Sequence, residues 1–174
     1  MTSRYEPGTL NFFLNKGEIV LLTGPTGCGK STFIHVINGI IPNVIPAELK
    51  GEIKVESNLI NNWSVKDRST KIGTIFQDPE SQLFALTVED DVAFGPENLG
   101  VEPNEIRQRV DKALKTTGLY KLKDKFIFHL SCGQKQRLAI AGMLAMAPDI
   151  ILFDEPTSDL DPQGTKEIID TIYK

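Results

Sequence analysis

The stretch GPTGCGKS, residues 24–31, has the residue types of a loop that wraps around phosphate groups. Its glycines let the backbone approach an anion closely and turn N–H groups towards it. We expect Lys30 to neutralise the β- and γ-phosphates of a nucleotide and the Ser31 hydroxyl to ligate Mg²⁺. The loop residues expected to contact the nucleotide are Gly24, Pro25, Thr26, Gly27, Cys28 and Gly29. A chance glycine-rich turn is the weaker interpretation, because an expected strand precedes the motif and an expected helix follows it.

A second group of reactive side chains stands in DIILFDEP, residues 149–156. Four apolar residues lead into Asp154 and Glu155 at the end of an expected strand, where open α/β sheets place their chemistry. We expect Asp154 to reach Mg²⁺, through a water, and Glu155 to orient and polarise an attacking water. An acidic pair that only caps a strand end is the alternative, and the phosphate loop makes it the weaker one.

A third element, LSCGQKQR at residues 130–137, predicts the start of a helix. Ser131 and Gln134 have the spacing of a capping box, which leaves the other first-turn N–H groups of the helix exposed. With Gly133 beside the Ser131 hydroxyl, this helix end is a second candidate anion site. Taken alone, the segment predicts no more than a well-capped helix.

The elements that must position these groups alternate between strands and helices. We expect buried strands at 18–23 and 72–76, an apolar strand at 149–153, a half-exposed antiparallel strand in GEIKV, and a helix at 30–38 ended by Gly39. Residues 80–130 contain several prolines and glycines and an amphipathic helix at about 104–117, whose apolar face carries Ile106, Val110, Ala113 and Leu114. Further helices are expected at 131–146 and from about Thr165. The pattern predicts an α/β core with a helical insert.

Composition excludes several classes of protein. A length of 174 residues suits one domain with a substantial core, and 40% hydrophobic with 24% charged residues is ordinary for a globular protein. The net charge of −4, without a basic run, argues against nucleic-acid binding. Because no apolar run approaches the length of a membrane span, we expect any membrane role to come through a partner.

The phosphate loop, LSCGQ and DEPTSDLD, in this order and spacing, resemble the ATPase domain of ABC transporters. The resemblance implies an α/β P-loop NTPase of ABC type, with a mixed sheet core, an antiparallel β part and an inserted helical subdomain. It implies a nucleotide-binding core at 1–79 and 147–174 and a helical subdomain at 80–146. Two copies, identical or related, would pair head to tail, so that each ATP lies between one phosphate loop and the partner's LSCGQ helix.

Further site residues follow from this resemblance. Gln77 matches the glutamine that contacts Mg²⁺ and links the site to the membrane subunit. Thr32 matches a residue that holds the α-phosphate, and Asp159 and Asp161 match the loop that communicates across the dimer. Tyr5 is a candidate to stack on adenine, although a surface tyrosine is about equally consistent with the short segment that follows it.

The stretch at residues 76–100 is similar to the ATPases of energy-coupling-factor importers, which take up vitamins or transition-metal ions. This similarity implies a transmembrane coupling protein, a substrate-binding membrane subunit and a location on the cytoplasmic face of the membrane. The residues expected either to line the docking groove or to form the core of the helical insert are Leu83, Phe84, Leu86, Val88 and Phe94. The transported substrate is not encoded in the ATPase.

The sequence departs from the family pattern in two places. Cys132 replaces the first signature glycine, and the family arrangement brings it near Cys28 of the partner subunit, so we hypothesise that oxidation traps the dimer. The family also has a further strand and a histidine after TSDLD, so we expect an incomplete C-terminal part and slow hydrolysis, if any. His35 and His129 are expected to be packing or surface residues. The alternatives to an importer ATPase are a non-transport ABC ATPase and a nucleotide-binding or dimerisation module without turnover.

Overall fold

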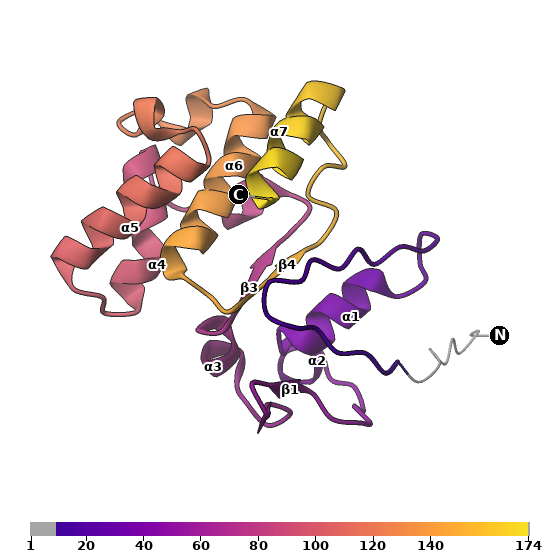
Figure 1. The fold of residues 1–174 in the computed structure, drawn as a ribbon. Helices are drawn as coiled ribbons and strands as arrows, with labels where there is room; N and C mark the ends of the chain where they lie inside the picture. The colour runs from indigo at the N-terminus through magenta and orange to yellow at the C-terminus, as the bar shows by residue number, and fades with distance from the viewer. Residues whose placement is uncertain (1–9, 174) are drawn as a thin grey trace.

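A computed structural model describes residues 10–173 of the chain (Figure 1). The strands β3 and β4 run through the middle of the molecule, between the α1–α3 region on one side and the helices α4–α7 on the other (Figure 1). In chain order, the first elements are α1 (Lys30–Ile37), α2 (Ile40–Asn43), β1 (Lys54–Val55), β2 (Asn58–Leu59), α3 (Val65–Ser69) and β3 (Ile72–Ile75). After them come η1 (Pro79–Gln82), α4 (Val88–Asn98), α5 (Pro103–Thr116), η2 (Tyr120–Leu122), η3 (Ile127–His129), α6 (Cys132–Met146), β4 (Ile150–Phe153) and α7 (Pro162–Ile172).

The central feature is the parallel pair of β3 and β4, which confirms two of the predicted strands. Their register places Ile72 opposite Ile150 and Ile75 opposite Phe153. The pairing continues one step further, because the Asp154 N–H donates to the Ile75 carbonyl over 2.9 Å. The carboxyl ends of both strands therefore lie at the same edge, which brings the residues after β3 next to the acidic pair after β4.

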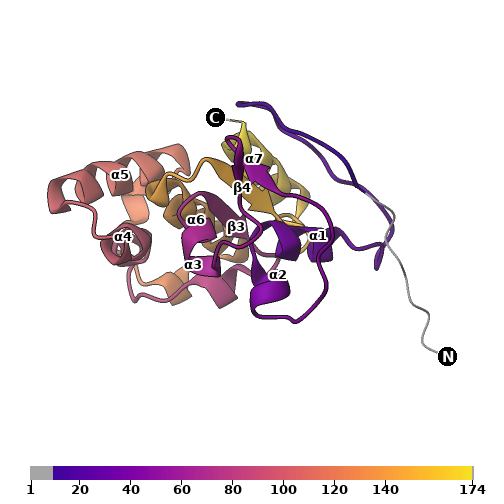
Figure 2. The same cartoon turned by 90° about the horizontal axis from the view of Figure 1, so that it is seen from below.

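The prediction of a buried strand at residues 18–23 is wrong. These residues carry no strand, and their apolar side chains are exposed, Leu21 to 85%. The segment runs as an extended arm past α1 (Figure 2). Its apolar composition predicts burial, but a strand also needs a neighbour for its backbone hydrogen bonds. Neither β3 nor β4 pairs with this segment.

Helix α1 is confirmed, and its far end is held by a residue that the sequence interpretation missed. The helix is capped at Asn38, and Gly39 follows with φ +84°. The buried Arg68 guanidinium, from α3, donates to the carbonyls of Val36 over 2.7 Å and Ile37 over 3.0 Å. These carbonyls have no partner within the helix, so Arg68 acts as a C-terminal cap. Burial lowers the pKa of Arg68.

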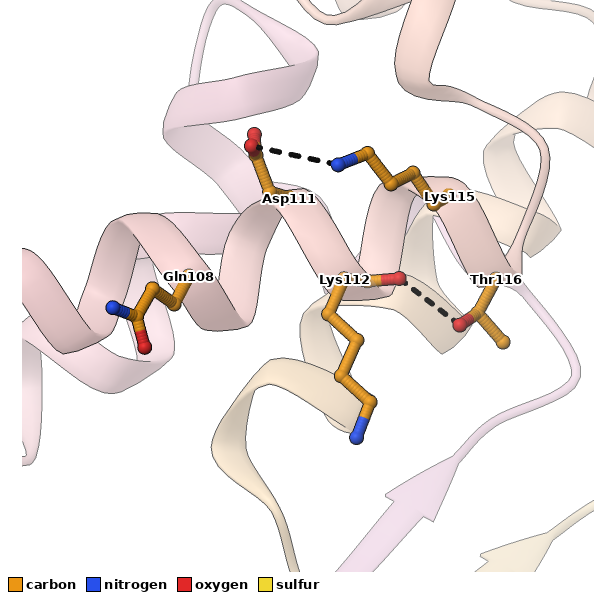
Figure 3. Close-up of a pocket in the computed structure, with 5 residues that line it drawn as sticks. All are labelled: Gln108, Asp111, Lys112, Lys115 and Thr116. Carbon is orange, nitrogen blue, oxygen red and sulfur yellow. Dashed lines mark hydrogen bonds and ion pairs between the residues drawn. The ribbon is translucent and has the colours of Figure 1, made fainter.

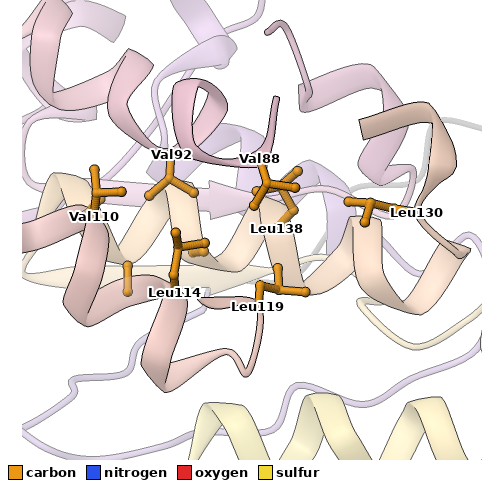
Figure 4. Close-up of a cluster of buried hydrophobic side chains, with 10 residues drawn as sticks. Val88, Val92, Val110, Leu114, Leu119, Leu130 and Leu138 are labelled. Carbon is orange, nitrogen blue, oxygen red and sulfur yellow. The ribbon is translucent and has the colours of Figure 1, made fainter. Parts of the chain in front are cut away.

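The helices α4, α5 and α6 share one apolar core, drawn in Figure 4. The predicted helices α5 and α6 are confirmed, and Val110, Ala113 and Leu114 of α5 are buried as expected, with Ile106 packed against the cluster. Helix α4 had not been predicted, although Thr87 caps it through the Asp90 N–H. It adds Val88 and Val92 to the core.

The remaining elements agree with the sequence interpretation in part. The GEIKV segment does form a short antiparallel strand, β1, which pairs with β2 and buries Val55. Helix α7 begins at Pro162, three positions before the predicted start, because the Asp161 carboxylate accepts from the Gly164 N–H over 2.7 Å. Between residues 10 and 173, none of the helices combines the length and apolar character that a membrane crossing requires.

Candidate functional site

The loop before α1 has the conformation that its glycines predict. Gly27 and Gly29 have φ values of +80° and +101°, in the region that glycine adopts without strain. Gly29 is the N-cap of α1 and offers no side chain to the helix, so the first-turn N–H groups point into the loop without a side-chain cap. The Lys30 ammonium folds back and donates to the carbonyls of Gly24, over 3.0 Å, and Pro25, over 3.3 Å. This arrangement is suited to hold an anion.

The acidic pair after β4 meets this loop directly. The Ser31 hydroxyl donates to Asp154 Oδ1 over 3.2 Å, a contact between residues 123 positions apart in the sequence. Glu155 Oε1 lies 3.8 Å from Lys30 Nζ. Glu155 has φ +49°, which is uncommon for a residue with a side chain and turns the chain sharply after β4. The structure thus brings the first two predicted motifs together at the carboxyl end of β4.

The Ser31 and Asp154 oxygens fit Mg²⁺. This ion prefers oxygen ligands and is bound by one or two carboxylates together with substrate phosphates, rather than by a dedicated cage of acidic residues. Within residues 10–173 there is no group of three or more His, Cys, Asp or Glu side chains arranged to hold a metal ion. A hydroxyl and a carboxylate in contact beside a phosphate loop are the donor set that a shared Mg²⁺–phosphate site needs.

Gln77 is exposed immediately beyond the end of β3. Two contacts hold this strand against α1, since Asn38 Nδ2 lies 3.4 Å from Thr74 Oγ1 and the Phe76 ring meets the His35 ring edge-on at 6.4 Å. His35 is four residues after Ser31, on the same face of α1. Gln77 therefore starts from the strand end that lies beside the phosphate-loop helix. His35 is a packing histidine, as expected.

The third predicted motif forms the capping box that its spacing indicates. Ser131 Oγ accepts from the Gln134 N–H over 3.3 Å, and Gln134 Oε1 accepts from the Ser131 N–H over 3.0 Å. A surface hollow joins this helix end to the chain before and within α7. Its lining residues include Ser131, Cys132, Gly133, Asp159 and Asp161, and none comes from the phosphate loop. The residues at 131–134 and Asp159 thus form a second cluster, separate from the first.

Sequence reasoning missed two residues that support the site. Lys135 of α6 forms an ion pair with Glu80 of η1, which ties the turn after Gln77 to the helix that Ser131 caps. The Gln82 amide holds the outer edge of β3 through two hydrogen bonds. Neither residue has a distinctive spacing, so the sequence carries no signal for their roles beyond the polar character of the segments that contain them.

Two further expectations concern positions outside this cluster. Tyr5, the candidate for adenine stacking, lies outside the described residues. Val88 is fully buried and Leu83 packs against the helical core, so for these two residues the core alternative holds. Phe84, Leu86 and Phe94 have exposures of 70%, 63% and 46%, and Phe84 stacks on Phe94 with ring centroids 5.4 Å apart.

Another hollow lies on α5, away from these residues. Figure 3 shows that its lining side chains all come from that one helix, with Gln108 and Lys112 pointing away from the Asp111–Lys115 pair. Lys115 Nζ lies 3.8 Å from Asp111 Oδ2, an ordinary pair one helical turn apart. None of the predicted site residues lines it, so it is not a candidate active site.

A family model described as ABC transporter matches residues 8–158. The chain belongs to the ABC transporter family. It is 52% identical over 165 residues to a Methanosarcina mazei protein named as an ABC transporter ATP-binding protein, which covers 95% of the chain and 28% of that protein. A protein of the same description from Pyrococcus horikoshii is 45% identical over 163 residues, 94% of the chain and 57% of that relative. The chain thus spans between about a quarter and three fifths of the length of these relatives.

The fold has a solved counterpart as well. CbiO1 from Clostridium perfringens, described as part of the ABC transporter complex cbiONQ, superposes with a TM-score of 0.77 at 43% identity. The match covers 86% of this chain and 59% of that structure. The predicted α/β fold of the ABC ATPase P-loop type is therefore confirmed, and so is the resemblance to the ABC transporter ATPases.

Proposed function

We propose that this chain is the ATP-binding and ATP-hydrolysing subunit of a transporter. The observation that carries the proposal is the 3.2 Å contact between the Ser31 hydroxyl and the Asp154 carboxylate. It joins the phosphate loop to the acidic strand end, with Lys30 Nζ and Glu155 Oε1 3.8 Å apart beside it. Phosphoryl transfer to water requires oxygen ligands for Mg²⁺, a cation for the phosphates and a group that orients the water. The hydroxyl, the two carboxylates and the ammonium at this helix N-terminus match these requirements.

The residues of this cluster would divide the chemistry among themselves. Lys30 and backbone N–H groups of the phosphate loop and of the first turn of α1 bind the phosphates of ATP, with Thr32 helping to hold the α-phosphate. Ser31, Asp154 and Gln77 hold Mg²⁺, which neutralises charge on the phosphate oxygens when bound. Glu155 accepts a hydrogen bond from the attacking water and orients it. Its exposed carboxylate, with half of the side chain's surface accessible, can take this role without leaving the end of β4.

We also propose a head-to-tail pair of chains, either two copies or this chain with a related ATPase. In such a pair the second cluster, Ser131, Gly133, Gln134 and Asp159, faces the ATP of the partner subunit. The capped but otherwise open N-terminus of α6 supports this role, because it offers N–H groups and a hydroxyl to the γ-phosphate. ATP then bridges two chains, and its hydrolysis releases them.

The transporter is proposed to be an importer of the energy-coupling-factor type for a vitamin or a transition-metal ion. Its support is the similarity to CbiO1, which belongs to the cbiONQ complex. The exposed Phe84, Leu86 and Phe94 offer an apolar surface for a membrane-embedded coupling protein. The chain would then sit on the cytoplasmic face of the membrane, held there by the coupling protein and a substrate-binding membrane subunit.

We propose a division into a nucleotide-binding part, at 1–79 and 147–174, and a helical part, at 80–146. Its support is the distribution of the buried apolar clusters along the chain. The largest cluster of buried side chains draws only on residues from 88 to 145. A second cluster around Val55, Ile60 and Ile72 belongs to the other part. Helix α6 also contributes Ile140 to a third cluster with Ile75 and Ile168, so it connects the two parts.

The test of the ATPase proposal compares the wild-type chain with Glu155→Gln and Lys30→Ala. We expect the wild-type chain to bind a fluorescent ATP analogue in the presence of Mg²⁺, and Lys30→Ala to bind it much more weakly. Glu155→Gln should keep binding while phosphate release falls about 10²- to 10⁴-fold, the usual contribution of a positioned base. Equal binding by wild type and Lys30→Ala would refute the assignment of the phosphate loop. Binding without any phosphate release by the wild type would favour a nucleotide-binding module without turnover.

A further inference from the structure

The turn that follows Gln77 is closed by the side chain of Gln82. Gln82 Nε2 donates to the Thr74 carbonyl over 3.0 Å, and its Oε1 accepts from the Phe76 N–H over 2.8 Å. Both bonds have ordinary lengths, and they reach backbone groups of the strand on either side of Ile75. One half-buried amide thus occupies two consecutive backbone groups of this strand.

These two backbone groups are the ones that a neighbouring strand would use. Ile75 turns its carbonyl towards β4, where it accepts from the Asp154 N–H. In a strand the groups of alternate residues point to opposite edges, so the Thr74 carbonyl and the Phe76 N–H face away from β4. In a parallel ladder, a single residue of the next strand bonds the carbonyl of one residue and the N–H two positions on. The Gln82 amide makes the same pair of bonds with its side chain.

The consequence concerns the residue that follows Phe76. With β4 on one edge and the Gln82 amide on the other, the end of β3 is fixed from both sides at the point where Gln77 leaves it. The turn between them is itself braced, because Asp78 Oδ1 accepts from the Glu80 N–H over 3.0 Å and Ser81 Oγ donates to the Asp78 carbonyl over 2.7 Å. The backbone at Gln77 therefore has little conformational freedom.

We propose that Gln82 is a positioning residue, which acts on the Mg²⁺–ATP site by fixing the backbone from which Gln77 projects. The proposal rests on the proposed function of Gln77 as a ligand of Mg²⁺. Gln82 does not itself touch nucleotide or metal. Residues that orient a metal ligand in this indirect way typically change metal affinity by about 10- to 100-fold when they are replaced.

The experiment uses the full chain as wild type, Gln82→Leu, Gln77→Ala and the double variant. Gln82→Glu keeps the oxygen that accepts from the Phe76 N–H and loses the donor to Thr74. The matched control is Gln108→Leu, the same chemical change at an exposed position of α5. A fluorescent ATP analogue is titrated first in EDTA and then at fixed nucleotide with increasing Mg²⁺. Hydrogen exchange of the Phe76 amide reports whether its hydrogen bond to the Gln82 side chain is kept.

We expect Gln82→Leu to raise the half-saturating Mg²⁺ concentration by about tenfold or more, to speed exchange at Phe76, and to leave binding in EDTA within about twofold of wild type. Gln82→Glu should recover part of the Mg²⁺ affinity, and Gln108→Leu should match wild type. If Gln82 acts through Gln77, the double variant binds Mg²⁺ no more weakly than Gln77→Ala alone.

Two results would overturn the proposal in distinguishable ways. An unchanged Mg²⁺ midpoint in Gln82→Leu, or a further loss in the double variant, refutes the positioning role while the ATP site stands. If the wild-type chain shows no Mg²⁺-dependent binding of ATP at all, the proposed function fails, and the positioning role fails with it. A purely structural effect would weaken binding in EDTA as much as in Mg²⁺, which also contradicts the proposal.

Discussion

Replacing Arg68 with methionine should destabilise the chain more than any surface change, because Arg68 donates to carbonyls at the end of α1 from a fully buried position. The guanidinium is fully buried and donates to the carbonyls of Val36, Ile37 and Asn61 at 2.7, 3.0 and 3.0 Å. Methionine fills much of the volume but donates nothing, so three carbonyls lose their partner in a place without ready access to water. Two of them also carry the negative end of the helix dipole.

The size of the effect follows from these three bonds. Hydrogen bonds from a charged donor are worth about 1.5–3 kcal/mol each, and the recovered cost of burying the guanidinium offsets part of their sum. We therefore expect a loss of about 3–5 kcal/mol, a large share of the roughly 5–15 kcal/mol that stabilises a typical domain. Urea unfolding followed by circular dichroism measures it, with Arg107→Met, an exposed arginine on α5, as the control. A loss below about 1 kcal/mol, or one equal to that of the control, would show that Arg68 is not the cap of α1.

The other predictions concern a glycine, a buried acid and the two cysteines. Gly39→Ala should cost about 1–2 kcal/mol in the same urea assay, because Gly39 has φ +84° and an added Cβ would lie 2.8 Å from Arg68 Cδ; an unchanged midpoint would contradict this. Burial raises the pKa of Asp91 despite hydrogen bonds from the Ala85 and Phe84 N–H groups, so its stabilising contribution is present at acid pH and lost as the carboxyl ionises. Asp91→Asn should therefore gain stability relative to wild type as the pH rises above about 4, the ordinary pKa of the carboxyl, and a pH-independent stability difference would refute burial as the cause. Cys132 is exposed and Cys28 partly so, and mild oxidation with Mg²⁺ and ATP should give a dimer band on non-reducing gels that Cys132→Ser lacks.

The chemistry-bearing segments could be predicted because their signals are local. A capping box is a motif of four consecutive residues, and Ser131 with Gln134, three positions apart, forms it as expected. The phosphate loop needs positive φ at particular positions, and glycines at those positions indicate this in the sequence. Strands β3 and β4 were recognisable because each is a short apolar run next to turn residues; in the structure β3 is buried and β4 is half-buried.

The errors arose where an element depends on distant partners. Residues 18–23 are as apolar as β3, yet burial and strand formation require a neighbouring strand, which composition does not supply. Helix α4 contains Gly95 and Pro96, and these residues obscured a helix that Val88 and Val92 stabilise by packing on α6. The short helix α3 was not predicted, although its Ser64 and Asp67 capping box is a local signal in the sequence.

The supports of the candidate site lie outside its motifs, and this determines which substitutions should matter. The phosphate loop is contacted by its own Lys30, and Ser31 at its end reaches the acidic strand end, while a Cβ added at Gly27 or Gly29 would meet no atom within 4 Å. Its position is therefore set by α1, which is held at its far end by Arg68 and along its side by β3. Changes at Arg68 should weaken nucleotide binding and stability together, whereas changes at Glu155 should affect turnover alone. The separation of these two outcomes tests whether the site is built as the contacts indicate.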